Sequence, residues 1–184
     1  MQHEITHSAP LLNDKGSLRE PGYAKRLLPI YRRADIRAGK TRIKEWDYYL
    51  AANDHFAVAL TIADNGYMGL DSISFLHFDE KWEKTKSPMR VFPMGRTGLP
   101  ETSAAGDSVI TGNGYGIAFR HVGDSRVLTF RMGDFLDGQA IEGRLTLTEE
   151  PEESMVIATP FDKPGHFYYN QKINCMRVSG EVNL

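Results

Sequence analysis

The fold class is decided by residues 55–78, which read HFAVALTIADNGYMGLDSISFLHF. In the first part of this stretch, large apolar side chains alternate with alanine and threonine, a pattern that suits a strand in a curved sheet. The dipeptide Asn65-Gly66 is strongly favoured in two-residue β-hairpin turns, because both residue types accept a positive φ. The chain is therefore expected to reverse there and to continue as an antiparallel partner strand.

The second strand of this hairpin changes its apolar phase. Large apolar residues occupy Met68 and Leu70, then Ile73 and Phe75, so the alternation slips by one residue. One extra residue inserted into a strand produces such a slip. A bulge or sharp bend is therefore predicted near residues 71–72.

Similar runs and turns fill the rest of the chain. Strands are expected in five further segments, which are 43–51, 115–119, 127–132, 140–148 and 154–159. Turns such as Gly123-Asp124 and Asp137-Gly138 separate them at hairpin spacing, and only residues 79–86 are expected to form a helical turn. The prediction is an all-β antiparallel meander with very little helix, forming a barrel or a strongly bent sandwich. The barrel is preferred, because long aromatic strands with glycines at bends suit closure.

Charge divides the chain into two parts. Between residues 25 and 44, lysine and arginine outnumber acids by eight to one. The preferred interpretation is a solvated connection, and the alternative is a patch that contacts anionic membrane headgroups or a phosphate-bearing ligand. The expected organisation is an extended N-terminal segment with this basic connection over residues 1–41, followed by a β-barrel domain over residues 42–184.

Composition disfavours several classes of protein. The net charge of -2 gives no overall attraction to nucleic acid. Cys175 is the only cysteine, so no intramolecular disulfide is expected and a reducing compartment is favoured. No apolar run reaches the length of a transmembrane segment, and the first residues lack the pattern of a secretory signal. A soluble, cytoplasmic protein is expected, without nucleic acid as a partner.

The motifs predict no metal and no cofactor. The six histidines show no His-Glu-x-x-His pattern, and no cysteine cluster accompanies them. The segment Gly112–Gly116 has the glycine content of a phosphate loop, but it opens a strand rather than a helix. It is expected to be a turn.

The candidate binding site lies at the end of the chain. From Met176 onward apolar and polar residues alternate, and continuing this phase backwards places polar side chains where a core would be. Buried polar groups need pairing, water or a ligand. The predicted ligand-binding residues on this strand are His166, Tyr168, Asn170, Lys172 and Asn174. The apolar part of the cavity is predicted from Trp46, Tyr48 and Tyr67, for each of which a filled core is the alternative.

The same terminal strand needs a neighbour. Its apolar residues from Met176 to Leu184 would otherwise expose an unpaired strand edge, which natural proteins normally cover or charge. Closure onto the first strands of the chain is the preferred expectation. A homodimer through this strand is the alternative.

Five strings of residues resemble one bacterial family. They are Gly22–Lys25 (GYAK), Arg42–Tyr49 (RIKEWDYY), Leu60–Asn65 (LTIADN), Met155–Phe161 (MVIATPF) and His166–Asn174 (HFYYNQKIN). Together they resemble the family of domain of unknown function 2804, and the similarity covers nearly the whole chain. Longer members of that family resemble this chain only in their N-terminal half. That family is distantly similar to lipocalin-like two-barrel proteins such as the carotenoid hydratase and tocopherol cyclase groups. The resemblance implies a lipocalin-like (calycin) barrel that is half of a two-barrel protein.

Three functions follow from these observations. The leading hypothesis is a barrel that holds a small amphipathic or lipid-like ligand, with the polar end bound by the terminal strand. The second is an enzyme on the same barrel, in which His166 or Asp64 transfers a proton to an isoprenoid-like or lipid-like substrate. The third is a structural half-barrel that completes a partner domain. A large apolar cavity would favour the first two over the third.

Overall fold

The computed structural model describes residues 3–184, which fold almost entirely as β-structure. Fifteen strands are present in this range, and its only helical element is the single 3-10 turn η1 (Arg33–Asp35). The chain divides into two compact units. Unit 1 consists of residues 3–39, 101–105 and 149–177, and unit 2 of residues 40–100, 106–148 and 178–184. The expected all-β class is therefore confirmed.

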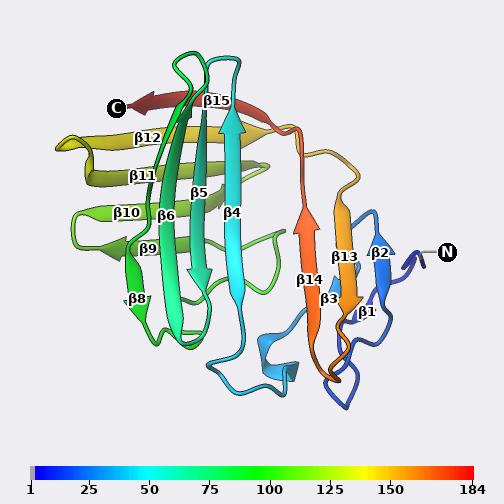
Figure 1. The fold of residues 1–184 in the computed structure, drawn as a ribbon. Coiled ribbons are helices and arrows are strands. Elements are labelled where there is room, and N and C mark those ends of the chain that lie inside the picture. The colour runs from blue at the N-terminus through cyan, green and yellow to red at the C-terminus, as the bar shows by residue number, and fades with distance from the viewer. Residues whose placement is uncertain (1–2) are drawn as a thin grey trace. The chain divides into compact units, whose positions relative to one another are not determined.

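Unit 2 contains two five-stranded antiparallel sheets. The first sheet has the order β4 (Glu45–Ala52), β5 (Phe56–Asp64), β6 (Met68–His77) and β7 (Trp82–Lys86), with β8 (Met89–Val91) paired to the start of β6. The second has the order β15 (Arg177–Asn183), β12 (Gln139–Thr148), β11 (Ser125–Leu136), β10 (Tyr115–Val122) and β9 (Ser108–Gly112). Figure 1 shows the strands of the second sheet running crosswise behind those of the first. Neither sheet closes on itself, so the prediction of a barrel is wrong. The alternative prediction, a strongly bent sandwich, agrees with the structure.

The core of unit 2 lies between these two sheets. Leu60, Ile62 and Ile73 from the first sheet are at most 1% exposed, and the second sheet contributes Ile117 and Leu128 at the same level. They come from alternate positions of their strands, which is why the alternation in the sequence identifies them. Burying each such side chain contributes about 1.5–3 kcal/mol of transfer free energy.

The hairpin between β5 and β6 forms at Asn65-Gly66 as predicted. Gly66 has φ +78°, and a Cβ there would lie 2.6 Å from the backbone of Thr41, so a larger residue would be both strained and obstructed. The pairing runs without interruption from Phe56 opposite His77 to Asp64 opposite Gly69. The bulge predicted near residues 71–72 is therefore wrong.

The apolar phase of β6 changes for a different reason. Gly69 and Asp71 occupy the inward positions of β6, where the guanidinium of Arg90 lies. A Cβ at Gly69 would lie only 2.8 Å from Cζ of Arg90, so glycine provides the space for this side chain. The inward face of β6 therefore begins with a charged pair and continues with Ile73 and Phe75.

The helical turn predicted over residues 79–86 is also wrong. Residues 79–81 form a tight turn, in which Lys81 has φ +57°, and the strand β7 starts at Trp82. Trp82 pairs with His77 and its ring packs 5.5 Å from that of Phe75. Burial of the indole against its neighbours therefore outweighs the weak local preference for helix.

Unit 1 is built around a three-stranded antiparallel sheet. Its order is β14 (Phe167–Lys172), β13 (Met155–Pro160) and β2 (Gly22–Ala24), and β1 (Ala9–Pro10) pairs in parallel with β3 (Pro29–Ile30). The core combines Ile5, Leu11, Leu12, Ala24, Val156 and Ala158. Phe167 and Tyr169 pack against it from β14.

The terminal stretch does not form one long strand. β14 ends at Lys172 and β15 starts at Arg177, with Cys175 at φ +63° between them. β15 pairs with β12, so the expected closure onto the first strands of the chain is wrong. A homodimer through β15 stays a prediction.

Candidate functional site

A hollow with a volume of about 380 Å³ opens between the two sheets of unit 2. Its lining residues are Phe56, Phe75, His77, Glu80, Trp82, Leu136, Gln139, Val182 and Leu184. Small-molecule sites in proteins measure roughly 300–1,000 Å³ and combine apolar walls with few polar groups. This hollow, called the aromatic cavity below, has the size and composition of a site for a small ligand.

The strand register builds one wall of the aromatic cavity from rings. Phe56 on β5 lies opposite His77 on β6, which lies opposite Trp82 on β7, so the three side chains share the inward face. Phe75 is two residues before His77 on the same face. Its ring centroid lies 5.4 Å from that of Phe56 and 5.5 Å from that of Trp82, while His77 and Trp82 are 5.4 Å apart. These spacings are those of favourable aromatic pairs, so the wall is preformed.

The other wall comes from the second sheet and is mostly aliphatic. Leu136 ends β11, Gln139 starts β12, and Val182 and Leu184 lie at the end of the chain segment that forms β15. The turn at Asp137-Gly138 joins the first two, and Gly138 has φ +84°. This wall presents methyl groups and one amide toward the rings.

The polar groups of the aromatic cavity are held by hydrogen bonds. Nε1 of Trp82 donates to Oε2 of Glu80 at 2.9 Å, and the backbone N–H of Glu80 donates to Nδ1 of His77 at 3.3 Å. Because Nδ1 accepts, the ring proton of neutral His77 is on Nε2. The tight turn between β6 and β7 therefore places a carboxylate and an imidazole at the edge of an aromatic surface.

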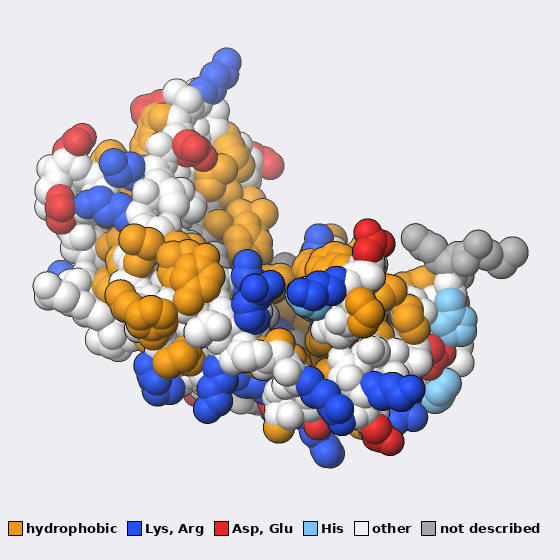
Figure 2. Space-filling view, turned by 60° about the horizontal axis from the view of Figure 1, so that its bottom comes forward, with side chains coloured by type: hydrophobic (Ala, Val, Ile, Leu, Met, Phe, Trp, Pro, Cys, Tyr) orange, Lys and Arg blue, Asp and Glu red, His pale blue; other side chains and the backbone are white. Residues whose placement is uncertain are grey.

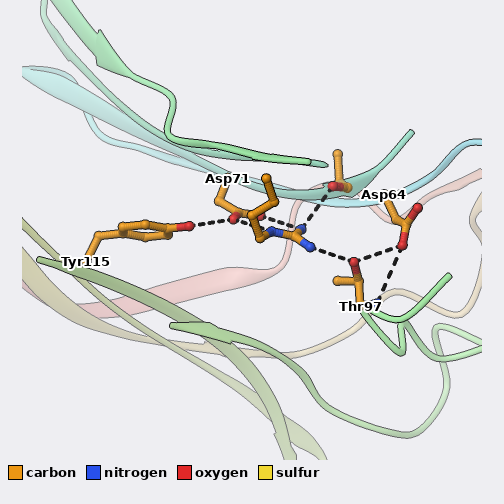
Figure 3. A network of polar contacts seen from close by, with 6 residues as sticks. Asp64, Asp71, Thr97 and Tyr115 are labelled. Atoms are coloured by element: carbon orange, nitrogen blue, oxygen red, sulfur yellow. Dashed lines mark hydrogen bonds and ion pairs between the residues drawn. The ribbon is translucent and has the colours of Figure 1, made fainter. Parts of the chain in front are cut away.

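A separate polar network is buried between the sheets of unit 2 (Figure 3). Asp71 is fully buried, and its two oxygens accept hydrogen bonds from Nε and Nη2 of Arg90 at 2.7 and 2.8 Å. The hydroxyl of Tyr115 donates to the same carboxylate at 2.8 Å. Burial and this hydrogen bond to Asp71 raise the pKa of Tyr115 to about 12. The contacts among Asp71, Arg90 and Tyr115 thereby join β6, β8 and β10.

Asp64 extends this network through Thr97. The hydroxyl of Thr97 accepts from Nη1 of Arg90 at 2.8 Å and donates to Oδ2 of Asp64 at 2.9 Å. Backbone N–H groups of Gly66 and Gly95 also donate to Asp64, at 3.0 and 2.8 Å. Burial alone would raise the pKa of Asp64, but these hydrogen bonds together outweigh it and hold the pKa below its ordinary value.

The chemistry of this network favours a structural role. An ionised carboxylate that accepts several hydrogen bonds is a weak base, since binding a proton would break some of them, so it is poorly suited to proton transfer. The network fixes the segment that follows β8 onto the ends of β5 and β6, because Gly95 and Thr97 belong to that segment. Asp64 is not among the residues that line the aromatic cavity.

The residues predicted to bind ligand are divided between the two units. His166, Tyr168, Asn170, Lys172 and Asn174 belong to unit 1, and Trp46, Tyr48 and Tyr67 belong to unit 2. Within unit 1, Nδ2 of Asn170 donates to the hydroxyl of Tyr168 at 2.6 Å. Within unit 2, Trp46 and Tyr48 lie on the outward face of β4, 40% and 54% exposed, and Tyr67 is 50% exposed in the hairpin turn. The role of these residues stays a prediction.

Sequence reasoning missed most of the aromatic cavity. The sequence placed Phe75 in a strand and Trp82 in the expected helical turn. Alternation across two consecutive hairpins could have found the wall, because Phe56, His77 and Trp82 are matched by register. The contribution of Val182 and Leu184 depends on pairing between distant strands, which no local pattern reveals.

The surface carries both basic and apolar side chains. Figure 2 shows Lys and Arg side chains interspersed with exposed hydrophobic ones over one face. Part of the basic segment is paired within unit 1: Lys25 lies 3.3 Å from Glu153, and Arg37 donates to the backbone oxygen of Asp14. Contact of this segment with anionic headgroups stays a prediction.

Within residues 3–184 no group of three or more His, Cys, Asp or Glu side chains is placed to hold a metal ion. The same residues include no helix with the length and hydropathy needed to cross a membrane.

Comparison with known proteins gives one match. The model of the family described as Domain of unknown function (DUF2804) matches residues 2–184. No curated protein and no solved structure matches the chain.

Proposed function

The chain belongs to the family described as Domain of unknown function (DUF2804), and from the geometry of unit 2 we propose that it binds a small amphipathic ligand in the aromatic cavity. The observation that carries the proposal is the preformed wall of Phe56, Phe75, His77 and Trp82, which faces a hollow of about 380 Å³. Apolar walls with few polar groups at one edge fit an apolar body with a polar end.

The energetics of the wall support a binding role over simple core packing. Core aromatic rings usually bury themselves by contact with the opposite sheet, since interiors are packed to about 0.74–0.76 of their volume. Here the hollow is open to solvent, and Phe56, His77 and Trp82 are only partly buried by the protein itself. Filling it would bury apolar surface at about 25 cal/mol per Å², so an amphipathic molecule gains affinity there without reorganising the sheet.

The enzyme hypothesis has less support from the described residues. Of its two candidate proton-transfer groups, Asp64 lies in the buried network, and neither Asp64 nor His166 lines the aromatic cavity. Binding without chemistry is therefore the function that the geometry favours. The predicted polar row on β14 stays a separate hypothesis about unit 1.

The proposal can be tested by filling the cavity. Val182 is half-buried in its wall, so Val182→Trp should occupy the hollow. Val178 is on the same strand and is not a lining residue, so Val178→Trp is the matched control. Titration with the neutral fluorescent probe N-phenyl-1-naphthylamine should show saturable binding to the wild type and to Val178→Trp. Binding to Val182→Trp should fall by about tenfold or more.

Two outcomes would contradict the proposal. One is the absence of saturable probe binding to the wild type. The other is equal binding to Val182→Trp and Val178→Trp when both variants melt at the wild-type temperature, because the probe would then occupy another surface.

A further inference from the structure

The charges that line the aromatic cavity indicate which charge its ligand should have. Among the described lining residues, Glu80 is the only aspartate, glutamate, lysine or arginine. No lysine or arginine is among those lining residues. An anionic ligand end would therefore meet a carboxylate there, with no cationic lining group to offset it.

The rings add to this preference. The face of an indole or phenyl ring is electron-rich and attracts a cation within about 6 Å of its centroid. Phe56, Phe75 and Trp82 form a contiguous ring surface, in which neighbouring centroids are 5.4 and 5.5 Å apart. The hydrogen bond from Nε1 of Trp82 to Glu80 holds a carboxylate at the edge of that surface. Aromatic faces beside a carboxylate are the surroundings that suit an organic ammonium group.

We infer that the aromatic cavity selects ligands whose polar end is a positively charged amine or quaternary ammonium group attached to a short apolar chain. This inference rests on the proposed function, since it names the ligand class of the same site. The apolar chain lies against Leu136 and Val182, and the ammonium group lies against Trp82 and beside Glu80.

Two lysines near the aromatic cavity suggest the opposite possibility, a ligand with an anionic end. Lys81 follows Glu80 in the tight turn, and Lys84 shares the inward face of β7 with Trp82, opposite Phe75 in the register. Neither is a lining residue, but the carboxylate end of an anionic ligand could form an ion pair with Lys84. The test therefore compares ligand ends of opposite charge on the same apolar chain.

The experiment measures displacement of N-phenyl-1-naphthylamine by octyltrimethylammonium, octanol and octanoate. The expected order of affinity for the wild type is octyltrimethylammonium, then octanol, then octanoate. Cation–π attraction at partly exposed sites predicts a preference of about two- to fivefold for the cation over the alcohol. The preference should shrink at high salt, because the charge of Glu80 is screened.

Three variants separate the contributions. Glu80→Gln keeps an oxygen that accepts the Trp82 N–H while removing the charge, so the preference for the cation should fall and octanol binding should remain. Trp82→Leu keeps an apolar side chain without the ring, and it should abolish the preference. Glu83→Gln makes the same charge change on the outward face of β7 and should leave all three affinities unchanged.

The outcomes distinguish this inference from the proposed function. Displacement by octanol with no advantage for octyltrimethylammonium would overturn the cation preference and leave cavity binding standing. Tightest binding of octanoate, lost in Lys84→Gln, would overturn it in favour of an anionic ligand. Failure of all three compounds to displace a probe that the wild type binds would contradict both, because no octyl chain would then occupy the cavity.

Discussion

The guanidinium of Arg90 contacts both carboxylate oxygens of Asp71, with Nε and Nη2 donating at 2.7 and 2.8 Å. Asp71 is fully buried, while the side chain of Arg90 is 21% exposed. The carboxylate therefore depends on this arginine and on Tyr115 for compensation of its charge. A parallel, two-pronged pair of this kind is stronger and more directional than a single contact.

Removal of Arg90 should strongly destabilise the protein. Arg90→Leu leaves a buried carboxylate without its cation, which costs about 3–5 kcal/mol in the free energy of unfolding. The double variant Asp71→Leu/Arg90→Leu should be less destabilised than the sum of the two single variants, because neither charge is then left alone. Urea unfolding followed by circular dichroism measures all three.

An exposed pair provides the control for Arg90. Arg131 and Glu142 lie 3.6 Å apart and both are more than half exposed. Arg131→Leu should change the free energy of unfolding by less than about 1 kcal/mol. If Arg90→Leu and Arg131→Leu lowered the free energy of unfolding equally, the buried pair would contribute no more to stability than the exposed pair.

Acid stability should depend on Asp64. Its folded pKa is lower than its ordinary value of 3.8, so the ionised form stabilises the fold above that value. This contribution is lost as pH falls below 3.8 toward the folded pKa, since the unfolded state binds the proton first. Asp64→Asn should be less stable at neutral pH and should lose less stability than the wild type on acidification. The exposed Asp162→Asn should follow the wild type, and a parallel acid curve for Asp64→Asn would refute the assignment.

Alkaline stability should depend on Tyr169. Its hydroxyl donates to the backbone oxygen of Pro29 at 3.0 Å, and burial raises its pKa to about 12. An unfolded tyrosine ionises near its ordinary pKa of 10.0, so the folded state binds more protons between these values and stability falls as pH rises from 10 to 12. Tyr169→Phe should flatten this loss, as measured by unfolding across that range. Tyr48→Phe, at an exposed position, should not flatten it.

Val58 tests the inward face of β5. Its side chain is 1% exposed, so Val58→Asp would bury an unpaired carboxylate. The cost of several kcal/mol is a large share of the roughly 5–15 kcal/mol that stabilises a typical domain, and the variant should not fold at 25 °C. Val109 is 43% exposed on β9, so Val109→Asp should remain folded. A cooperative thermal transition at the wild-type midpoint for Val58→Asp would show that its face of the strand is solvated.

Local patterns predicted the hairpins well, because turn dipeptides act within a few residues. Asn65-Gly66, Gly123-Asp124 and Asp137-Gly138 each connect the strands expected from the sequence. The slip in β6 was misread as a bulge because an inward Asp71 looks like a break in the apolar pattern. Only the position of Arg90, which lies on a different strand, shows that the carboxylate is paired.

The candidate site was harder to predict, since its walls combine residues from both sheets. Alternation predicted the two faces of β5, but it could not show which face of β4 lies outward. Trp46 and Tyr48, which were predicted to line a cavity, lie on the outward face of β4, and their role stays a prediction. The break between β14 and β15 at Cys175 contains no turn dipeptide, so local patterns could not predict it.

The discontinuous make-up of unit 1 has a consequence for synthesis on the ribosome. Its core joins Ile5 and Leu11 with Val156 and Ala158, which the ribosome adds about 150 residues later. Ile5 and Leu11 therefore lack these apolar partners until residues 156–158 have emerged. Unit 2 meets no such delay in its first sheet, whose strands are consecutive from β4 to β7. During translation this sheet can therefore form before the core of unit 1 is complete.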